Sequence, residues 1–352
     1  MNINIVKNVI KNISYNDLMK FKQKHNDDGS KNVMINNKGF IFIGKGGEGY
    51  IYKYDDIAIK FYKNNKSAKN ELNIMNKFNV IIKEHISNNF LEIYDHITIY
   101  NHDIVFMECM DGNLEEWTTE YHEINEWKSM IIQILYGLLV MQYCTEIFHN
   151  DMKPKNILFK RIKKQNIRYI INEKIITFET EFIFKIADFG HSQCLTETIK
   201  EEDKQYIKIS IKNNLDLYHL ASFHNRLLVD AIHSSHTLND LLNMGKTIDK
   251  FEDYVKNERD VIKQNMTSYD QRTRDKMLFR SLTYFLIEHN KFDYDNVPNF
   301  TKYILPIKDI RNILDSLNFV KEYDGIIKKI EEISIHFNEL GNDYETFILK
   351  IN

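Results

Sequence analysis

The sequence predicts an α+β fold of two lobes: a small lobe with a five-stranded antiparallel sheet and one helix, and a larger, mainly helical lobe. Two observations lead to this prediction. Between residues 40 and 107, β-branched and aromatic runs alternate with turn residues around one stretch of helical period. From Leu114 onward, the apolar residues follow a helical period. We expect an N-terminal extension at 1–37, the small lobe at 38–107, a connector at 108–112, and the large lobe with a divergent helical C-terminal region at 113–352.

Composition sets the outer limits on function. The 352 residues are 43% hydrophobic with a formal net charge of -3, enough for a sizeable core. Neither a basic excess nor an acidic tail is present, so we expect no nucleic-acid partner. We find no apolar stretch of membrane-spanning length and no secretory leader. The three cysteines, Cys109, Cys144 and Cys194, lie far apart and build neither a disulfide framework nor a Cys-x-x-Cys site. We therefore expect a reducing, cytoplasmic location.

A glycine-rich stretch follows the first predicted strand. Four of the twelve glycines of the chain fall between Gly44 and Gly49, directly after the apolar run 40–43. In a dinucleotide-binding fold such glycines open a helix. Here Tyr50 to Tyr54 reads as a second strand instead, so the glycines form the turn of a hairpin.

The next segment supplies a lysine and a carboxylate. Ile57 to Tyr62 predicts a third strand with Lys60 at its middle. Apolar residues at 68, 72, 75 and 78 then predict a helix that carries Glu71. Glu71 is the candidate ion-pair partner of Lys60, with Glu84 as a competitor and a solvated carboxylate as the plain alternative. Segments 90–100 and 102–107 predict the last two strands.

The segment from Phe148 to Phe159 carries Asp151, Lys153 and Asn156 at fixed offsets. Phosphoryl transfer needs a carboxylate for the acceptor hydroxyl, a cation for the phosphate and a ligand for the metal. The plain alternative is a polar turn before a short strand. Asp188-Phe189-Gly190 follows 37 residues after Asp151, at the end of an apolar strand, which favours the functional interpretation.

In this order the motifs resemble the catalytic domain of eukaryotic-type protein kinases of the serine/threonine type. The resemblance implies ATP and Mg²⁺ as cofactors and a protein substrate with a serine or threonine acceptor. Asp151 would be the catalytic base, Lys153 would contact the phosphate, and Asn156 and Asp188 would hold the metal. The nucleotide would be bound by Ile43, Gly44, Lys45, Gly46, Gly47, Glu48, Gly49, Tyr50, Ile51, Lys60 and Glu71, and by the backbone of Glu108 and Met110.

The sequence departs from the family pattern in several places. Asn150 replaces the arginine that precedes the catalytic aspartate in many kinases, and no Ala-Pro-Glu follows Gly190. The segment 213–220 is similar to the start of the family's central helix, in which Asp216 would brace the catalytic loop. The activation segment would then be short, and the stretch 160–181 is longer than the usual hairpin. The short activation segment, Ser192-Gln193 after Asp188-Phe189-Gly190 and the N-terminal extension resemble the divergent serine/threonine kinases of poxviruses and other large DNA viruses.

Two other functions remain open. A small-molecule kinase of the choline or aminoglycoside type often carries a similar His-Asn-Asp sequence, although Lys153 and Asp188-Phe189-Gly190 argue against that class. A catalytically inactive scaffold usually loses Lys60, Asp151 or Asp188, and all three are present. A serine/threonine-specific protein kinase is therefore the preferred hypothesis.

Overall fold

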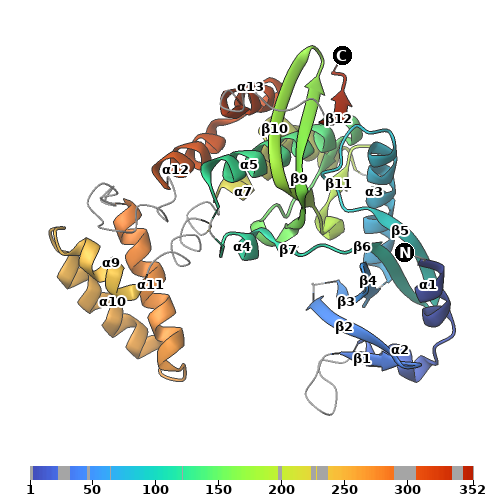
Figure 1. Ribbon diagram of the computed structural model, residues 1–352, viewed down its shortest axis with the longest axis horizontal. Coiled ribbons are helices and arrows are strands. Elements are labelled where there is room, and N and C mark those ends of the chain that lie inside the picture. Colours follow the sequence, from blue (N-terminus) through green and yellow to red (C-terminus); the bar gives the residue numbers. More distant parts are fainter. Residues whose placement is uncertain are drawn as a thin grey trace.

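The computed structural model describes residues 3–22, 32–45, 48–63, 65–120, 122–196, 200–222, 227, 237–288, 307–334 and 344–351. They form a small lobe at the lower right of Figure 1 and a large lobe above it and to its left. The small lobe consists of α1 (Ile3–Lys11), α2 (Tyr15–Lys20), β1 (Val33–Ile35), β2 (Lys38–Lys45), β3 (Gly49–Tyr54), β4 (Ile57–Tyr62), α3 (Asn65–Lys83), β5 (Ile93–Ile99) and β6 (His102–Glu108).

The small-lobe sheet is antiparallel, with the strand order β1-β2-β3-β4-β6-β5. The five predicted strands are β2 to β6. The sheet gains a sixth strand, β1, from the segment that the sequence analysis assigned to the extension. Asn36 and Asn37 both have positive φ angles, 50° and 60°, and they form the two-residue turn that pairs β1 with β2. Asparagine tolerates this conformation better than most residues, so the Asn-Asn pair was the signal for the turn.

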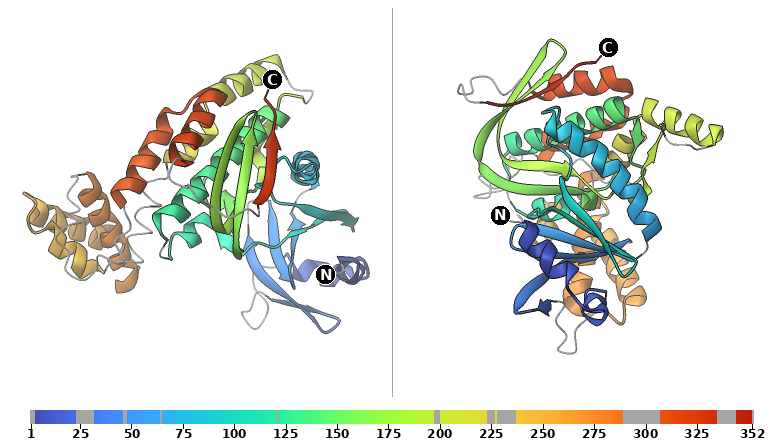
Figure 2. Two further views of the ribbon diagram at one scale, coloured as in Figure 1. Left: turned by 45° about the horizontal axis from the view of Figure 1, so that its top comes forward. Right: turned by 90° about the vertical axis from the view of Figure 1, so that its right-hand side faces the viewer.

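In the described part of the N-terminal extension, α1 and α2 cover the outer face of the sheet. Phe21, at the end of α2, stacks on Phe61 of β4 with ring centroids 4.2 Å apart and meets Phe40 and Tyr52 edge-on. All four rings are at most 1% exposed. With α3 on the opposite face, every residue of β4 is buried. Figure 2 shows α1 and α2 packed against this sheet. The extension is therefore part of the small-lobe core.

The large lobe begins with β7 (Gly112–Asn113), α4 (Leu114–Trp117), α5 (Ile124–Thr145), β8 (Ile147–Phe148), η1 (Pro154–Asn156), β9 (Ile157–Ile171), β10 (Lys174–Ile186), η2 (Phe189–His191), β11 (Gln193–Cys194), α6 (Glu201–Lys212) and α7 (Leu215–Ser222). It continues with α9 (Leu238–Gly245), α10 (Phe251–Asn265), α11 (Gln271–Glu288), α12 (Ile307–Ser316), η3 (Leu317–Phe319), α13 (Glu322–Ser334) and β12 (Tyr344–Leu349). The helices α9, α10 and α11 form a group at one side of this lobe (Figure 1).

The stretch 160–181 forms most of a long hairpin, β9 and β10, which packs on α5 and α13. The last strand, β12, pairs in parallel with β9, so the sheet order is β10-β9-β12. The expectation of helices alone beyond residue 230 therefore needs correction at β12. Parallel pairing of strands distant in the chain leaves no local sequence signal, whereas hairpins are marked by their turns.

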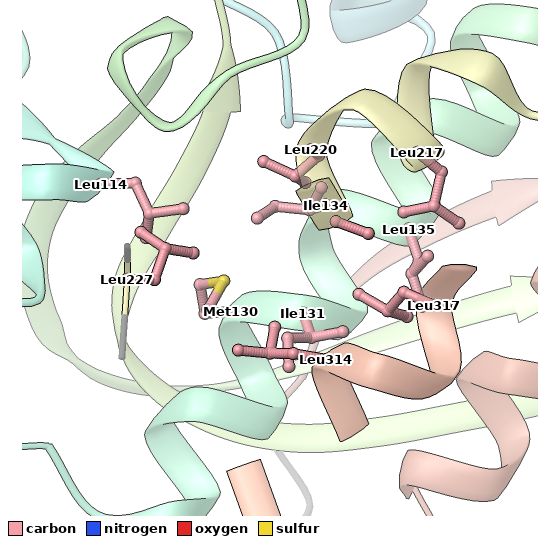
Figure 3. A pocket seen from close by; sticks show the side chains of 11 residues that line it. Leu114, Met130, Ile131, Ile134, Leu135, Leu217, Leu220, Leu227, Leu314 and Leu317 are labelled. Atoms are coloured by element: carbon pink, nitrogen blue, oxygen red, sulfur yellow. The ribbon is translucent and has the colours of Figure 1, made fainter. Parts of the chain in front are cut away.

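The core of the large lobe is built on α5, which is buried along most of its length. An apolar pocket lies where α5 meets α4, α7, α12 and η3 (Figure 3). Its lining is aliphatic apart from the sulfur of Met130, so it offers no group for phosphate chemistry. Within the described part of the chain, no helix has both the length and the apolar character required to cross a membrane.

The packing of Phe21 predicts a test of the extension. Phe21→Ala should lower the free energy of unfolding by about 3–5 kcal/mol, because it removes a fully buried ring from an aromatic cluster. Urea denaturation measures the change. Ile5→Ala on α1 is the control, since Ile5 is 50% exposed. Equal, small effects of both substitutions would show that the extension is not part of the core.

Candidate active site

Lys60 and Glu71 form a buried ion pair between β4 and α3. The Lys60 ammonium donates to both Glu71 carboxylate oxygens, at 2.7 Å and 2.6 Å, and the two residues are 6% and 3% exposed. The competitor Glu84 lies exposed after the end of α3. Lys60 also lies 3.9 Å from Asp188 Oδ1. The predicted pairing is present, and the lysine is held between carboxylates from both lobes.

The glycine-rich turn lies beside this pair. Ile43, Gly44 and Lys45 end β2, while Gly49, Tyr50 and Ile51 begin β3. A side chain at Gly49 would come within 2.6 Å of the Phe61 carbonyl oxygen, so the close approach of β3 to β4 requires glycine there. The turn also reaches the large lobe, because the Glu48 side chain lies next to Gly190. Gly46 and Gly47 lie outside the described residues.

The catalytic-loop candidates converge on one carboxylate. Lys153 Nζ donates to Asp151 Oδ2 at 2.6 Å, and Asn156 Nδ2 donates to the same oxygen at 2.9 Å and to the Asp151 carbonyl at 2.8 Å. Burial alone would raise the pKa of Asp151, but the hydrogen bonds from Lys153 and Asn156 outweigh it and hold the pKa below its ordinary value. Asp151 is therefore an ionised acceptor at neutral pH.

His149 and Asp216 fix the backbone of this loop through hydrogen bonds. The Asp216 carboxylate accepts hydrogen bonds from the backbone N–H groups of His149 and Asn150, at 2.8 Å and 2.9 Å. These contacts fix Asn150, whose φ angle is 61°. Burial lowers the pKa of His149, so the ring is neutral, with Nε2 donating to Ala187 O and Nδ1 accepting from Asp151 N–H. The predicted bracing by Asp216 is present.

Asp188 and Phe189 connect the loop to α3. Asp188 adopts a left-handed conformation, with φ 65°, at the end of β10. Phe189 packs between His149 and Phe78 of α3, with centroid distances of 5.2 Å and 4.8 Å, and Phe78 stacks on Phe90. This row of buried rings joins the two lobes and holds Asp188 beside Lys60.

At the connector, Glu108 forms contacts that the sequence analysis missed. Its carboxylate accepts from Lys185 at 2.5 Å and from Lys160 at 3.4 Å, both from the β9–β10 hairpin. Its backbone N–H donates to Glu92 O, so a ligand could meet only the carbonyl of Glu108. At Met110, the carbonyl lies 3.7 Å from the Cys109 thiol. The sequence signal for this contact is weak. Lys185 is a lysine within an apolar strand, three residues before Asp188, and nothing in the sequence indicates Glu108 as its partner.

Two further residues of α3 contact the segment after Gly190. Asn70 Nδ2 donates to Ser192 O at 3.2 Å. Lys77 Nζ lies 2.9 Å from both Cys194 Sγ and Thr196 Oγ1. The helix that carries Glu71 is therefore fastened to the large lobe along its length.

Together these contacts gather the charged groups of the candidate site at the junction of the two lobes. Residues 38–209 match the family model of the protein kinase domain. This part of the chain belongs to the eukaryotic-type protein kinase superfamily, and its fold is the two-lobed kinase fold.

Individual relatives are distant. A curated protein of Drosophila melanogaster, described as a putative dual specificity tyrosine-phosphorylation-regulated kinase 3 homolog, is 28% identical over 151 residues, which cover 36% of this chain and 17% of the relative. The chain thus spans a small part of that protein. A crystal structure of a kinase domain is 17% identical with a TM-score of 0.39, covering 87% of this chain and 97% of the other.

The buried carboxyl of Asp216 predicts a pH dependence of stability. Burial raises its pKa to about 7, although the two backbone hydrogen bonds lower it. Between these two pKa values, the folded state therefore keeps a proton on Asp216 that the unfolded chain, with a pKa of about 3.9, has already released at lower pH. The contribution of this group to stability is present at low pH and declines as the pH rises toward about 7.

The free energy of unfolding should thus fall relative to that of Asp216→Asn by about 1.4 kcal/mol per pH unit between about pH 5 and pH 7. Urea denaturation of both proteins across this range measures it. A constant difference between them would show that Asp216 is ionised throughout.

Proposed function

We propose that this chain is an ATP-dependent protein kinase that transfers the γ-phosphate of ATP to serine and threonine hydroxyls of protein substrates. The observation that carries the proposal is the presence of two sets of groups, which are linked by the backbone hydrogen bond from Ala187 N–H to Asn156 O at 2.9 Å. The Lys60–Glu71 pair faces Asp188, while Asp151, Lys153 and Asn156 form one hydrogen-bonded group. Family membership supports the protein kinase activity, and the finer specificity rests on Lys153.

The residues present suit ATP and Mg²⁺. The described residues contain no group of three or more His, Cys, Asp or Glu side chains arranged around a metal. Mg²⁺ commonly takes only one or two carboxylates and completes its shell with phosphate oxygens and water. Asp188 is 38% exposed in its side chain and beside Lys60, which suits that mode, with the Asn156 amide as the second protein ligand.

Each protein group then has a defined task. Lys60, oriented by Glu71, would hold the α- and β-phosphates, and the turn 44–49 would cover them. Bound Mg·ATP supplies the phosphoryl group and neutralises its charge. Asp151 would accept the proton of the acceptor hydroxyl, and Lys153 would contact the γ-phosphate. The carbonyl of Glu108 and the N–H of Met110 would meet the adenine edge. We propose a cytoplasmic location for this activity.

The experiment that tests this proposal is an assay with labelled ATP and Mg²⁺ on a mixture of generic protein substrates. Asp151→Asn should lower kcat by about 10²- to 10⁴-fold, the range typical of a general base, while the Kd for ATP stays near its original value. Asp253→Asn, at an exposed position of α10, is the control. The labelled product should contain phosphoserine and phosphothreonine.

Three outcomes would overturn parts of the proposal. Equal loss of ATP binding and turnover in Asp151→Asn would make Asp151 structural. Phosphotyrosine as the main product would contradict the acceptor preference. Transfer to choline or an aminoglycoside with proteins unlabelled would favour a small-molecule kinase.

We also expect activity without phosphorylation of the activation segment. Asn150 is neutral, and the contacts of Asn70 and Lys77 already fasten α3 to this segment. Ser192 and Ser210 are buried, and Thr196 is exposed, whereas Thr198 lies outside the described residues. Lys77 is a cation beside Thr196 that the sequence analysis did not foresee. It pairs with the unmodified hydroxyl, so no phosphate is needed for this contact.

Phosphatase-treated protein, and the variant with Thr196→Ala and Thr198→Ala, should therefore keep most of the original activity toward an added substrate. Labelled-ATP transfer measures it, and intact-mass analysis confirms that the protein carries no phosphate. Silencing by phosphatase, followed by recovery after treatment with an upstream kinase, would show that a phosphate orders this segment.

A further inference from the structure

Tyr62 lies against the ion pair although no step of the proposed chemistry uses it. Residues 60 and 62 alternate with Phe61 on β4, so Lys60 and Tyr62 share the face that meets α3. The Tyr62 hydroxyl donates to Glu71 Oε2 at 2.7 Å, and Lys60 Nζ lies 4.6 Å from the centre of the Tyr62 ring. Tyr62 is fully buried.

This hydrogen bond is important because Glu71 has few hydrogen-bond donors besides Lys60 in the described contacts. Glu71 is 3% exposed, so the protein must satisfy its carboxylate, because an unpaired buried charge is costly. Lys60 has three N–H donors and now makes two hydrogen bonds, one to each Glu71 oxygen. Any phosphate held by Lys60 must draw on the same ammonium. Among the contacts described, Tyr62 is the donor to Glu71 that such a phosphate would leave in place.

We propose that Tyr62 is a positioning residue that keeps Glu71, and with it α3, in place when Lys60 donates to the nucleotide phosphates. This inference rests on the proposed use of ATP. It assigns Tyr62 the role of a second anchor for Glu71, independent of the lysine.

Tyr62 is itself held firmly. It pairs with Gly49 across β3 and β4, and its carbonyl accepts from Lys22 Nζ of the N-terminal extension at 2.6 Å. Burial, followed by the charge of Glu71, raises the pKa of Tyr62 far above its ordinary value. The hydroxyl therefore keeps its proton at neutral pH and can donate to Glu71.

Tyr62→Phe tests the proposal because it removes only the hydroxyl and retains the ring beside Lys60. The KM for ATP and the Kd for Mg·ATP should each rise about tenfold, whereas kcat at saturating ATP should change little. This split is expected because the lost hydrogen bond contributes equally in the nucleotide complex and in the transition state. Tyr62→Leu, which also removes the ring, should raise both constants further.

Tyr169→Phe is the matched control, since the Tyr169 hydroxyl is also a donor from a fully buried ring, to Asn89 Oδ1 at 3.1 Å, but on β9 of the large lobe. It should leave the KM for ATP unchanged. Amide hydrogen exchange gives a second measurement that needs no activity. Exchange in α3 of nucleotide-bound Tyr62→Phe should be faster than in the original protein and in Tyr169→Phe.

The outcomes separate this inference from the proposed function. Failure of the original protein to bind ATP or transfer phosphate would overturn the proposed function. If the original protein is active, an unchanged KM and unchanged exchange in α3 of Tyr62→Phe would overturn the positioning role alone. A rise in KM of equal size in both phenylalanine variants would mean that the loss is a general effect of destabilisation.

Discussion

A buried ion pair between Lys60 and Glu71 imposes the strongest constraint on this structure. Two charges removed from water are costly unless each is paired and hydrogen-bonded. The chain meets this requirement by placing Lys60 on β4 against Glu71 on α3. The Tyr62 hydroxyl donates to Glu71, and Asp188 lies near Lys60. Displacement of α3 would leave a lysine and a carboxylate unpaired in the core, so the pair and the helix keep their positions together.

Segments far apart in the chain serve this arrangement. The N-terminal helices pack Phe21 against the reverse side of β4, and Lys22 reaches the Tyr62 carbonyl. Just after the C-terminal end of α3, Ile348 of β12 donates its N–H to His85 O, and the Tyr136 hydroxyl donates to Ile86 O. Contacts in the activation segment fasten the middle of the helix. All of these contacts are made by side chains and backbone groups of the chain itself, which agrees with the proposal that the site needs no added phosphate.

Much of the site could be predicted from sequence because its residues lie in short motifs with fixed spacing. Lys60, Asp151, Asn156 and Asp188 are examples, and the helical period correctly selected Glu71 over Glu84. Even the long-range contact of Asp216 followed from the family pattern. The roles of these residues in binding ATP and Mg²⁺, and the weaker resemblance to viral kinases, stay predictions.

What escaped prediction depends on tertiary packing. Val33 to Ile35 is too short to identify as a strand without recognising its Asn-Asn turn, and β12 pairs with a strand more than 170 residues away. Lys77 looks like an ordinary solvated lysine of a helix, yet it contacts Cys194 and Thr196. Tyr62 was visible as a neighbour of Lys60 on the same strand face. Its partner, however, becomes known only when α3 is placed.

The central claim is that the Lys60–Glu71 pair is complete in the unmodified protein. The most direct measurement is a crystal structure of phosphatase-treated protein without nucleotide. We predict that Lys60 Nζ lies within hydrogen-bonding distance of both Glu71 carboxylate oxygens and that Phe189 packs between Phe78 and His149. An outward displacement of α3 that separates Lys60 from Glu71, with Phe189 removed from this row of rings, would contradict the account.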